Sequence, residues 1–219
     1  MPVEIYYNLA SPPSRAVLLL AKTLKIVPAL HLVDILKGEQ FNPDFTELNP
    51  QHTVPVLIDE GFIITESQAS LIYLADIYDE SKSVYPEDVE QTAVIHQRLY
   101  FNVGTIMRRL LGAYIMPVIF ENKRKVDDEN LTMLEEAFNT LNIYLDGQNW
   151  VAGDQITIAD FSLIASVSTA EAVGFPVSKY PNVMAWLDRC KSTMTGYKEI
   201  NQEGCDLMAQ VYKAKMHSN

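Results

Sequence analysis

The stretch NLASPPSRAVLLLAK, residues 8–22, passes from polar residues through Ser11 and two prolines into an apolar run. Serine is a preferred helix N-cap residue, and proline is tolerated in the first turn, where its missing N–H has no partner. The stretch therefore predicts a helix that begins directly after Ser11. Two roles remain open for this serine. It caps the helix and does nothing more, or it presents its hydroxyl at a helix N-terminus where an anion binds.

The segments on either side of this helix are predicted to be strands. Val3–Tyr7 is rich in β-forming residues, Arg15–Leu24 carries a helical apolar stripe, and Ala29–Val33 follows as a second strand. A strand–helix–strand order predicts that the two strands are parallel and are joined by a right-handed crossover.

The next segment predicts a short helix, a hairpin and a second long helix. NPDFTELNP (residues 42–50) is a short helix between asparagine–proline pairs. Two apolar runs, Val56–Ile58 and Phe62–Ile64, flank a turn in which Gly61 can adopt a positive φ. ESQASLIYLADIYD (residues 66–79) then has helical spacing.

The rest of the chain predicts helices only. ESKSVYPED (residues 80–88) is a polar linker, and apolar residues recur with helical spacing over 87–120, 127–146, 157–172, 182–194 and 203–215. Pro117 is expected to kink or end the first of these helices near Met116. The predicted fold class is therefore an α/β domain over residues 1–80 followed by an all-helical domain over residues 87–219.

The composition excludes several classes of protein. An apolar fraction of 48% is enough for a hydrophobic core, and a net charge of −11 argues against a general nucleic-acid-binding protein. Cys190 and Cys205 fit free thiols in a reducing compartment, with a single disulfide as the alternative. No metal-ligand spacing is present. The apolar run Ala16–Ala21 is too short to span a bilayer and no signal-type segment precedes it, so we expect a cytoplasmic location without a membrane partner.

Several segments together resemble the cytosolic glutathione transferases, most closely the insect delta and epsilon classes. They are SPPSRAV, LKGEQFNPDFTELNPQHTVPVL, ESQASLIYLADIYD, VAGDQITIADFSL and YPNVMAWLDRC, and the resemblance extends from Tyr6 to Asn201. It implies a thioredoxin-like N-terminal domain that binds glutathione and an all-helical C-terminal domain that helps to bind an electrophile. It also implies a homodimer in which each active site lies next to the subunit boundary.

The resemblance assigns the glutathione site residue by residue. Ser11 matches the serine that hydrogen-bonds the glutathione sulfur, and Pro55 matches a cis proline that presents the backbone of Val54 to the cysteinyl part. His52 would approach the glycyl carboxylate. Glu66 would accept the γ-glutamyl ammonium. The resemblance assigns three more residues of the segments HTVPV and ESQ to the same site, namely Thr53, Ser67 and Gln68.

An apolar wall facing the sulfur is expected from helical spacing along the first long helix. Its candidate residues are Leu9, Pro12, Met107, Leu110, Leu111 and Tyr114. An interior core stripe explains the same spacing, and both readings remain open. Thr157 and Asp160 form a capping box, which we interpret as structural.

Three positions depart from the pattern of the family. Many delta-class sequences have histidine in place of Gln40 and arginine or histidine in place of Gln68, and an acid often stands in place of Asn102. These differences put the strength of glutathione binding in doubt, but they do not affect Ser11.

The expected function is transfer of the glutathione thiolate to hydrophobic electrophiles, as in detoxification, with glutathione as co-substrate and no metal. Peroxidase, dehydrohalogenase and isomerase activities use the same thiolate, and the sequence does not choose among them. A non-enzymatic ligand carrier on the same fold is the second hypothesis. A thiol–disulfide transferase is disfavoured because Ser11 and Ser14 occupy the region where a cysteine would be needed.

Overall fold

The computed structural model describes residues 2–217, and its N-terminal part is built on a four-stranded sheet in the order β2-β1-β3-β4. The elements of this part are β1 (Glu4–Tyr7), α1 (Pro12–Thr23), β2 (Ala29–Leu32), η1 (Ile35–Lys37), η2 (Glu39–Phe41), α2 (Pro43–Leu48), β3 (Val56–Asp59), β4 (Phe62–Ile64) and α3 (Ser67–Tyr78). The expected order of strands and helices is therefore confirmed.

The pairing of the strands also matches the sequence pattern. β1 and β2 are parallel, whereas β3 is antiparallel to both β1 and β4. The β3–β4 hairpin turns at Glu60 and Gly61, which both have positive φ, 49° and 87°. Two central residues with positive φ define the hairpin turn whose twist matches that of the flanking strands.

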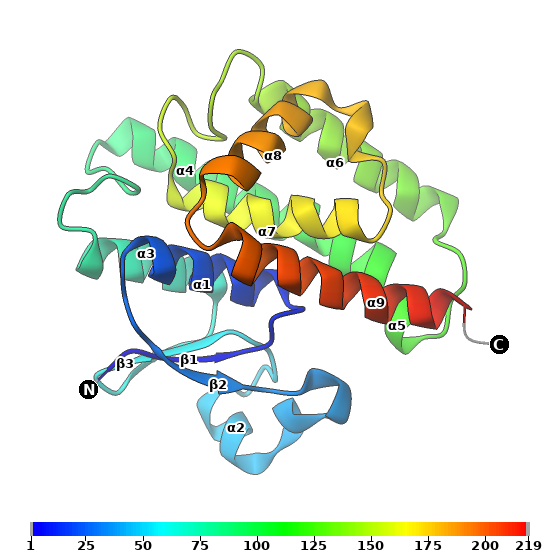
Figure 1. The fold of residues 1–219 in the computed structure, drawn as a ribbon, viewed down its shortest axis with the longest axis horizontal. Coiled ribbons are helices and arrows are strands. Elements are labelled where there is room, and N and C mark those ends of the chain that lie inside the picture. Colours follow the sequence, from blue (N-terminus) through cyan, green and yellow to red (C-terminus); the bar gives the residue numbers. More distant parts are fainter. Residues whose placement is uncertain (1, 218–219) are drawn as a thin grey trace.

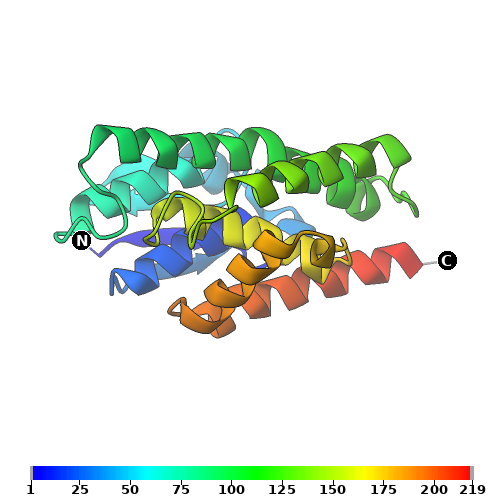
Figure 2. The same ribbon diagram turned by 90° about the horizontal axis from the view of Figure 1, so that it is seen from above.

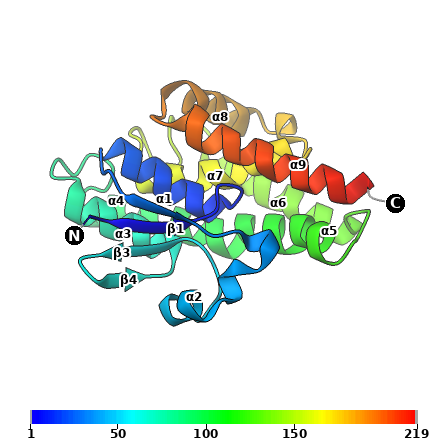
Figure 3. The same cartoon turned by 60° about the horizontal axis from the view of Figure 1, so that its bottom comes forward.

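Helices cover both faces of the sheet. α1 and α3 lie side by side on one face, and α2 lies on the other (Figures 1 and 3). A small second core forms between the sheet and α2, where Phe45 packs with Val33, Val54 and Val56. This arrangement is the thioredoxin-like domain that the resemblance implied.

The C-terminal part is helical throughout its regular structure. Its elements are α4 (Val89–Phe101), η3 (Asn102–Ile115), α5 (Met116–Phe120), α6 (Asp128–Tyr144), α7 (Ile158–Ala172), η4 (Val177–Lys179), α8 (Pro181–Thr193), η5 (Tyr197–Gln202) and α9 (Glu203–His217). The run from α4 to α5 lies along α6 (Figure 2).

The first long helix changes its hydrogen-bonding register instead of ending. Over η3 the backbone is π-helical, and the N–H of Met116 donates to the carbonyl of Leu111, five residues earlier. Pro117 is the second residue of α5 and has no N–H to donate, and the Ala113 carbonyl four residues earlier accepts the Asn130 side-chain amide at 3.3 Å. The expected break near Met116 is thus a switch from π-helix back to α-helix.

Helix α7 is the centre of the main core. Every residue from Ile158 to Ala170 is buried, and the helix packs against α1, so one hydrophobic core joins the two parts of the molecule.

The helical run Val89–Phe120 is long and apolar enough to span a bilayer by length and composition alone. Here it packs against α6 and α7, so part of its apolar surface serves the protein interior.

The predicted capping box at the start of α7 is present. Asp160 is fully buried, and its carboxylate accepts the Thr157 N–H at 2.8 Å and the Thr157 hydroxyl at 3.2 Å. The same carboxylate accepts the Val151 N–H at 3.0 Å and the Trp186 indole N–H at 2.9 Å. Burial raises the pKa of Asp160 to about 6. This residue holds three segments of the helical domain together.

Candidate active site

A cavity of about 400 Å³ opens where loops of the sheet domain meet the helical domain. Its lining residues from the sheet domain are Asn8, Ala10, Ser11, Pro12, Pro13, Asp34, Ile35, Leu36, Gln51, His52, Thr53, Val54, Pro55, Thr65, Glu66 and Ser67. Its lining residues from the helical domain are Val103, Met107, Leu111, Met116, Ile119, Phe120, Met208 and Val211. All residues of the second group are apolar, so the cavity has a polar wall and an apolar wall.

Ser11 occupies the N-cap of α1 and lines the cavity. Its Oγ accepts the N–H of Ser14 at 3.5 Å, a long bond for a cap, and the residue is half-buried. The loop before it is shaped by Asn8, whose side chain accepts the Ala10 N–H at 3.0 Å and donates to the Val33 carbonyl at 2.9 Å. Sequence reasoning missed Asn8, because a polar residue in a loop gives no local sign of its distant partner.

The loop from Asn49 to Pro55 forms the next part of the polar wall. The Val54–Pro55 peptide bond is cis, as the resemblance implied. Asn49 is fully buried and donates to the Thr53 carbonyl at 2.8 Å and to the Thr53 hydroxyl at 3.0 Å. His52 has a positive φ of 57°, and its ring lies against Phe41 with the centroids 5.3 Å apart. Asn49 therefore orders the loop that carries His52 and Val54, a role that the sequence did not indicate.

The start of α3 closes the polar wall. Glu66 stands at the N-cap and is exposed, and its side chain makes no capping hydrogen bond. Ser67 is buried and lines the cavity. Gln68 is buried outside the cavity lining, and its amide nitrogen donates to Ser67 Oγ at 3.3 Å. Glu66 and Ser67 thus belong to the wall, whereas Gln68 lies behind it.

The apolar wall follows a wider spacing than the predicted one. Met107 and Leu111 line the cavity together with Val103 and Met116, so the lining positions are four to five residues apart. This spacing follows from the π-helical register of η3, in which each turn contains more residues than an α-helical turn. Sequence reasoning assumed α-helical spacing and missed Val103 and Met116.

Three residues expected in this wall do not line the cavity. Leu110 is fully buried in the core, and Leu9 is packed against the same core. Tyr114 stacks on Tyr212, with ring centroids 6.1 Å apart, and burial raises its pKa. Of the expected apolar residues, Pro12, Met107 and Leu111 line the cavity. Met208 and Val211 of α9, three residues apart on one helix face, complete the wall, and the sequence pattern of α9 could have suggested them.

The three departures from the family pattern all lie in buried positions. Asn102 is fully buried, and its amide donates to the Ser162 carbonyl at 3.0 Å and to the Ser162 hydroxyl at 2.7 Å. Gln40, Gln68 and Asn102 each have a buried amide oxygen without a hydrogen-bond partner in the described part of the chain. None of these three side chains lines the cavity.

The electrostatics of the cavity are set by few charges. Asp34 is paired with Lys37 at 2.9 Å, and this hydrogen bond lowers the pKa of Asp34. Glu66 has no ion-pair partner among residues 2–217 and remains available to a cation. The N-terminus of α1 favours an anion beside Ser11. The cavity can therefore hold a polar, zwitterionic molecule and an apolar molecule side by side, with an anionic atom at Ser11.

Comparisons with known proteins identify two family models in this chain. The glutathione S-transferase N-terminal domain matches residues 10–77, and the glutathione S-transferase C-terminal domain matches residues 80–193. Glutathione S-transferase D7 of Anopheles gambiae is 39% identical over 218 residues, which cover 99% of each chain.

Solved structures agree with this similarity. A delta-class glutathione transferase of Nilaparvata lugens superimposes with a TM-score of 0.93 at 40% identity, over 98% of this chain and 100% of that chain. A glutathione transferase homologue of Drosophila mojavensis, solved with bound glutathione, has a TM-score of 0.93 at 33% identity, over 98% of this chain and 97% of that chain.

Proposed function

Since this chain belongs to the glutathione S-transferase family, we propose that Ser11 is its catalytic residue and that its hydroxyl donates a hydrogen bond to the glutathione sulfur. The supporting observation is the position of Ser11 at the N-terminus of α1, in a cavity that has both a polar and an apolar wall. A free thiol has a pKa of about 8.5 and is mostly protonated at neutral pH, whereas the thiolate is the nucleophile. A hydroxyl donor at the positive end of a helix stabilises the thiolate.

The two roles of Ser11 are compatible. A serine hydroxyl has one donor and two acceptor sites. As a cap, Ser11 uses an acceptor site for the N–H of Ser14, so its proton is available to the sulfur. The long capping distance of 3.5 Å further indicates that this hydroxyl is held weakly by the helix.

Glutathione occupies the polar wall in this proposal. Glu66 accepts the γ-glutamyl ammonium, and Ser67 with the first N–H groups of α3 holds the adjoining carboxylate. The backbone of Val54 pairs with the cysteinyl part, and His52 with its neighbour Thr53 faces the glycyl end. The side chain of Gln68 acts on the ligand through its hydrogen bond to Ser67.

The electrophile occupies the apolar wall beside the sulfur. The thiolate attacks an electrophilic carbon, the carbon–sulfur bond forms, and the displaced group leaves with its electron pair. Met107, Met116 and Met208 make the wall adaptable in shape, because methionine is flexible and polarisable. Peroxide reduction, dehydrohalogenation and isomerisation would use the same thiolate on other compounds, and a substrate screen distinguishes them.

Two further proposals concern the protein as a whole. A homodimer is supported by exposed apolar side chains on the hairpin and on α4, among them Phe62, Val89 and Tyr100. Static light scattering at micromolar concentration tests the homodimer, and a measured mass of one chain would contradict it.

A cytoplasmic location is supported by two buried cysteines that are both free thiols.

The role of Ser11 is tested by the ultraviolet absorbance of the thiolate as a function of pH. Wild type and Ser11→Ala are both saturated with glutathione and titrated under the same conditions. We expect the titration of the variant to move to higher pH, with activity partly restored in alkaline buffer. Identical titration curves with unchanged turnover would leave Ser11 as a helix cap only.

A further inference from the structure

Arg15 is a buried cation in the first turns of α1, directly behind the loop that carries Ser11. Its side chain is fully buried, and it is one of the largest side chains in the core. Among residues 2–217 it forms no ion pair with a carboxylate. Burial lowers the pKa of its guanidinium, yet an arginine side chain stays protonated in proteins. A buried charge without a counterion is costly unless many dipoles compensate for it.

The compensating dipoles come from both domains. The Nε group donates to the Asn201 side chain at 2.9 Å, and one terminal nitrogen donates to the Ala165 carbonyl at 3.0 Å and to the Thr169 hydroxyl. The other terminal nitrogen donates to the carbonyl oxygens of Leu9 and Ala10, at 2.9 and 3.0 Å. These contacts account for all five N–H donors of a guanidinium.

The two loop carbonyls are the contacts that bear on function. Leu9 and Ala10 directly precede Ser11 in the chain, and Ala10 itself lines the cavity. The other partners of Arg15 belong to α7 and η5 of the helical domain. Arg15 therefore ties the backbone that orients Ser11 to the central helix of the core.

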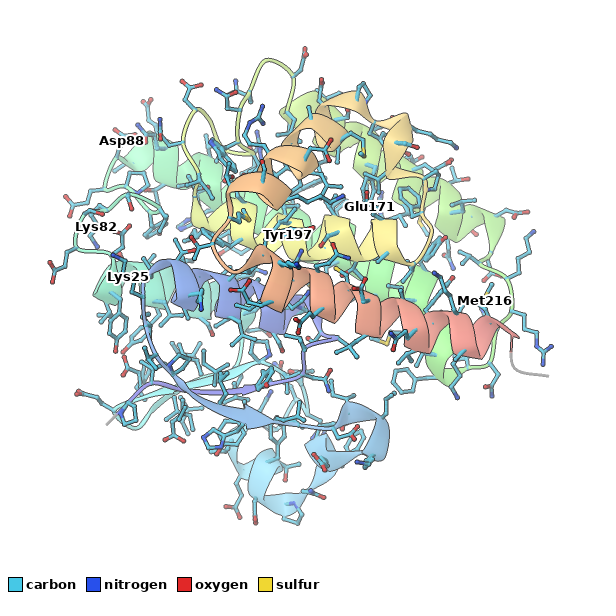
Figure 4. All side chains as sticks on the ribbon, in the orientation of Figure 1. Lys25, Lys82, Asp88, Glu171, Tyr197 and Met216 are labelled. Atoms are coloured by element: carbon cyan, nitrogen blue, oxygen red, sulfur yellow. The ribbon has the colours of Figure 1, made fainter. Side chains whose placement is uncertain are left out.

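The residues around Arg15 pack closely and restrict its side chain to one conformation. A Cβ atom at Gly204, the second residue of α9, would clash with the Leu9 carbonyl and with the Arg15 side chain. Asn201 is held in turn by a hydrogen bond to the Ser168 hydroxyl at 2.8 Å. Figure 4 labels Tyr197, the first residue of η5, at the point where the chain passes from α8 toward α9, and η5 packs against α1 and α7.

We propose that Arg15 is a positioning residue for the transferase reaction: by fixing the Leu9 and Ala10 carbonyls, it holds the Ser11 hydroxyl in the orientation that meets the glutathione sulfur. The inference rests on the role proposed for Ser11. Its physical basis is that a small displacement of a catalytic group has a large effect on rate, and that two hydrogen bonds from a rigid, charged donor fix a loop more firmly than neutral ones.

The test uses Arg15→Lys, which keeps the positive charge but loses the planar fork, and Arg15→Met, which keeps the length but loses the charge. The measurement is the pH titration of the glutathione thiolate, with kcat and KM for glutathione measured alongside. We expect the titration to move upward by about one pH unit, which is about a tenfold change in equilibrium constant. We also expect kcat at neutral pH to fall about tenfold, while KM changes less because the polar wall is intact.

Other titratable groups stay the same in these variants. Asp34, His52 and Glu66 line the cavity and are not altered. Cys205 of α9 and Tyr197 of η5 are the titratable groups whose charges act on Arg15, and both are buried. A shift of the thiolate titration that both Arg15 variants share therefore reports the loss of the guanidinium and of its hydrogen bonds to the loop.

Thr157→Ala is the matched control, because it weakens the same central helix α7 at its N-terminus, whereas Arg15 contacts Ala165 and Thr169 in the second half of that helix. It should lower stability and leave the titration unchanged. If the Arg15 variants do not fold, Gly204→Ala tests the same loop from α9 and should move the titration in the same direction.

The outcomes separate the two proposals. If Ser11→Ala moves the titration and folded Arg15→Lys, or Gly204→Ala in its place, overlays wild type, the role of Arg15 is refuted and that of Ser11 stands. If Ser11→Ala leaves the titration unchanged, both roles are refuted. If the thiolate titration shifts as much in Thr157→Ala as in Arg15→Lys, the effect of Arg15 comes from a general loss of stability, and its positioning role is refuted.

Discussion

The starts of α1 and α7 are two helix N-termini with a hydroxyl residue at the cap, and they are built in opposite ways. At α7, Thr157 and Asp160 bond to each other inside the core, and the carboxylate is further used by Val151 and Trp186. At α1, the Ser11 hydroxyl makes one long bond, and the first turn of the helix contains no acidic residue.

The difference shows what distinguishes a structural cap from a binding position. The cap of α7 is saturated, since its partners are all supplied by the protein itself. The cap of α1 leaves both a hydroxyl proton and the positive end of a helix facing a cavity. A bound anion can complete the second cap but not the first, and the following predictions test this contrast.

The largest effect is expected from Asp160→Ala. The substitution leaves the buried N–H groups of Val151, Thr157 and Trp186 without their acceptor, and we expect a loss of about 3–5 kcal/mol in the free energy of unfolding. Urea unfolding followed by circular dichroism measures it. The variant that remains folded should keep the glutathione thiolate titration of wild type. A loss below about 1 kcal/mol would contradict the structural importance of this cap.

Ser11→Gly separates capping from catalysis at the other helix. Glycine replaces serine at an N-cap with a loss of only a few tenths of a kcal/mol, but it has no hydroxyl. A lost hydrogen bond to a charged atom is worth roughly 1.5–3 kcal/mol, so turnover with saturating glutathione should fall roughly 10- to 150-fold. Steady-state kinetics checks the fall in turnover, and thermal unfolding of the same preparation checks the small loss of stability. Unchanged turnover would assign Ser11 to the helix alone.

The pH dependence of stability should carry the signature of Asp160. Burial raises its pKa from 3.8 to about 6, so between these pH values the folded state holds a proton that the unfolded state has released. The contribution of this carboxyl to stability is therefore complete below pH 3.8, declines as the pH rises to about 6, and is constant above it. The decline is about 3 kcal/mol. The unfolding free energy of wild type minus that of Asp160→Asn, measured from pH 4 to 7, should fall over this range, and a flat difference would refute the assignment.

The smallest effect is expected from Thr157→Ala. Loss of a hydroxyl at an N-cap typically lowers stability by about 1 kcal/mol, and the Asp160 carboxylate keeps its bond to the Thr157 backbone. Kcat and KM should match wild type, because residue 157 lies outside the cavity lining. Thr157→Ser, which retains the hydroxyl, is the control. A change in kinetics without a change in stability would contradict the structural interpretation.

Local patterns predicted most of the fold. The helix after Ser11, the turn at Gly61 and the capping box at Thr157 were all predicted, because each depends on residues within a few positions of one another. Family resemblance supplied the cis peptide bond before Pro55, which no local pattern gives.

Most of the parts that sequence reasoning missed depend on contacts between distant residues. Asn8 and Arg15 shape the polar wall through Val33 and Asn201, which lie far along the chain, and nothing near them in the sequence reveals those partners. Asn49 bonds to Thr53 in its own loop, and the residue pattern of that loop does not indicate this bond. Hydrophobic spacing predicts the apolar wall with an α-helical period, because the π-helical register of η3 cannot be read from that spacing alone. The α-helical period puts Tyr114 at the cavity, whereas in the structure Tyr114 stacks on Tyr212 of the helical domain.

The division of the cavity between two stretches of chain has a consequence for evolution and engineering. The polar wall comes from residues 8–67 and the apolar wall of the helical domain from residues 103–211, with no polar lining residue in the second stretch. Duplicated genes can therefore diversify the second stretch and acquire new target compounds while they keep the same co-substrate. A combinatorial library confined to the apolar positions of η3, α5 and α9 would explore this diversity without disturbing the thiol.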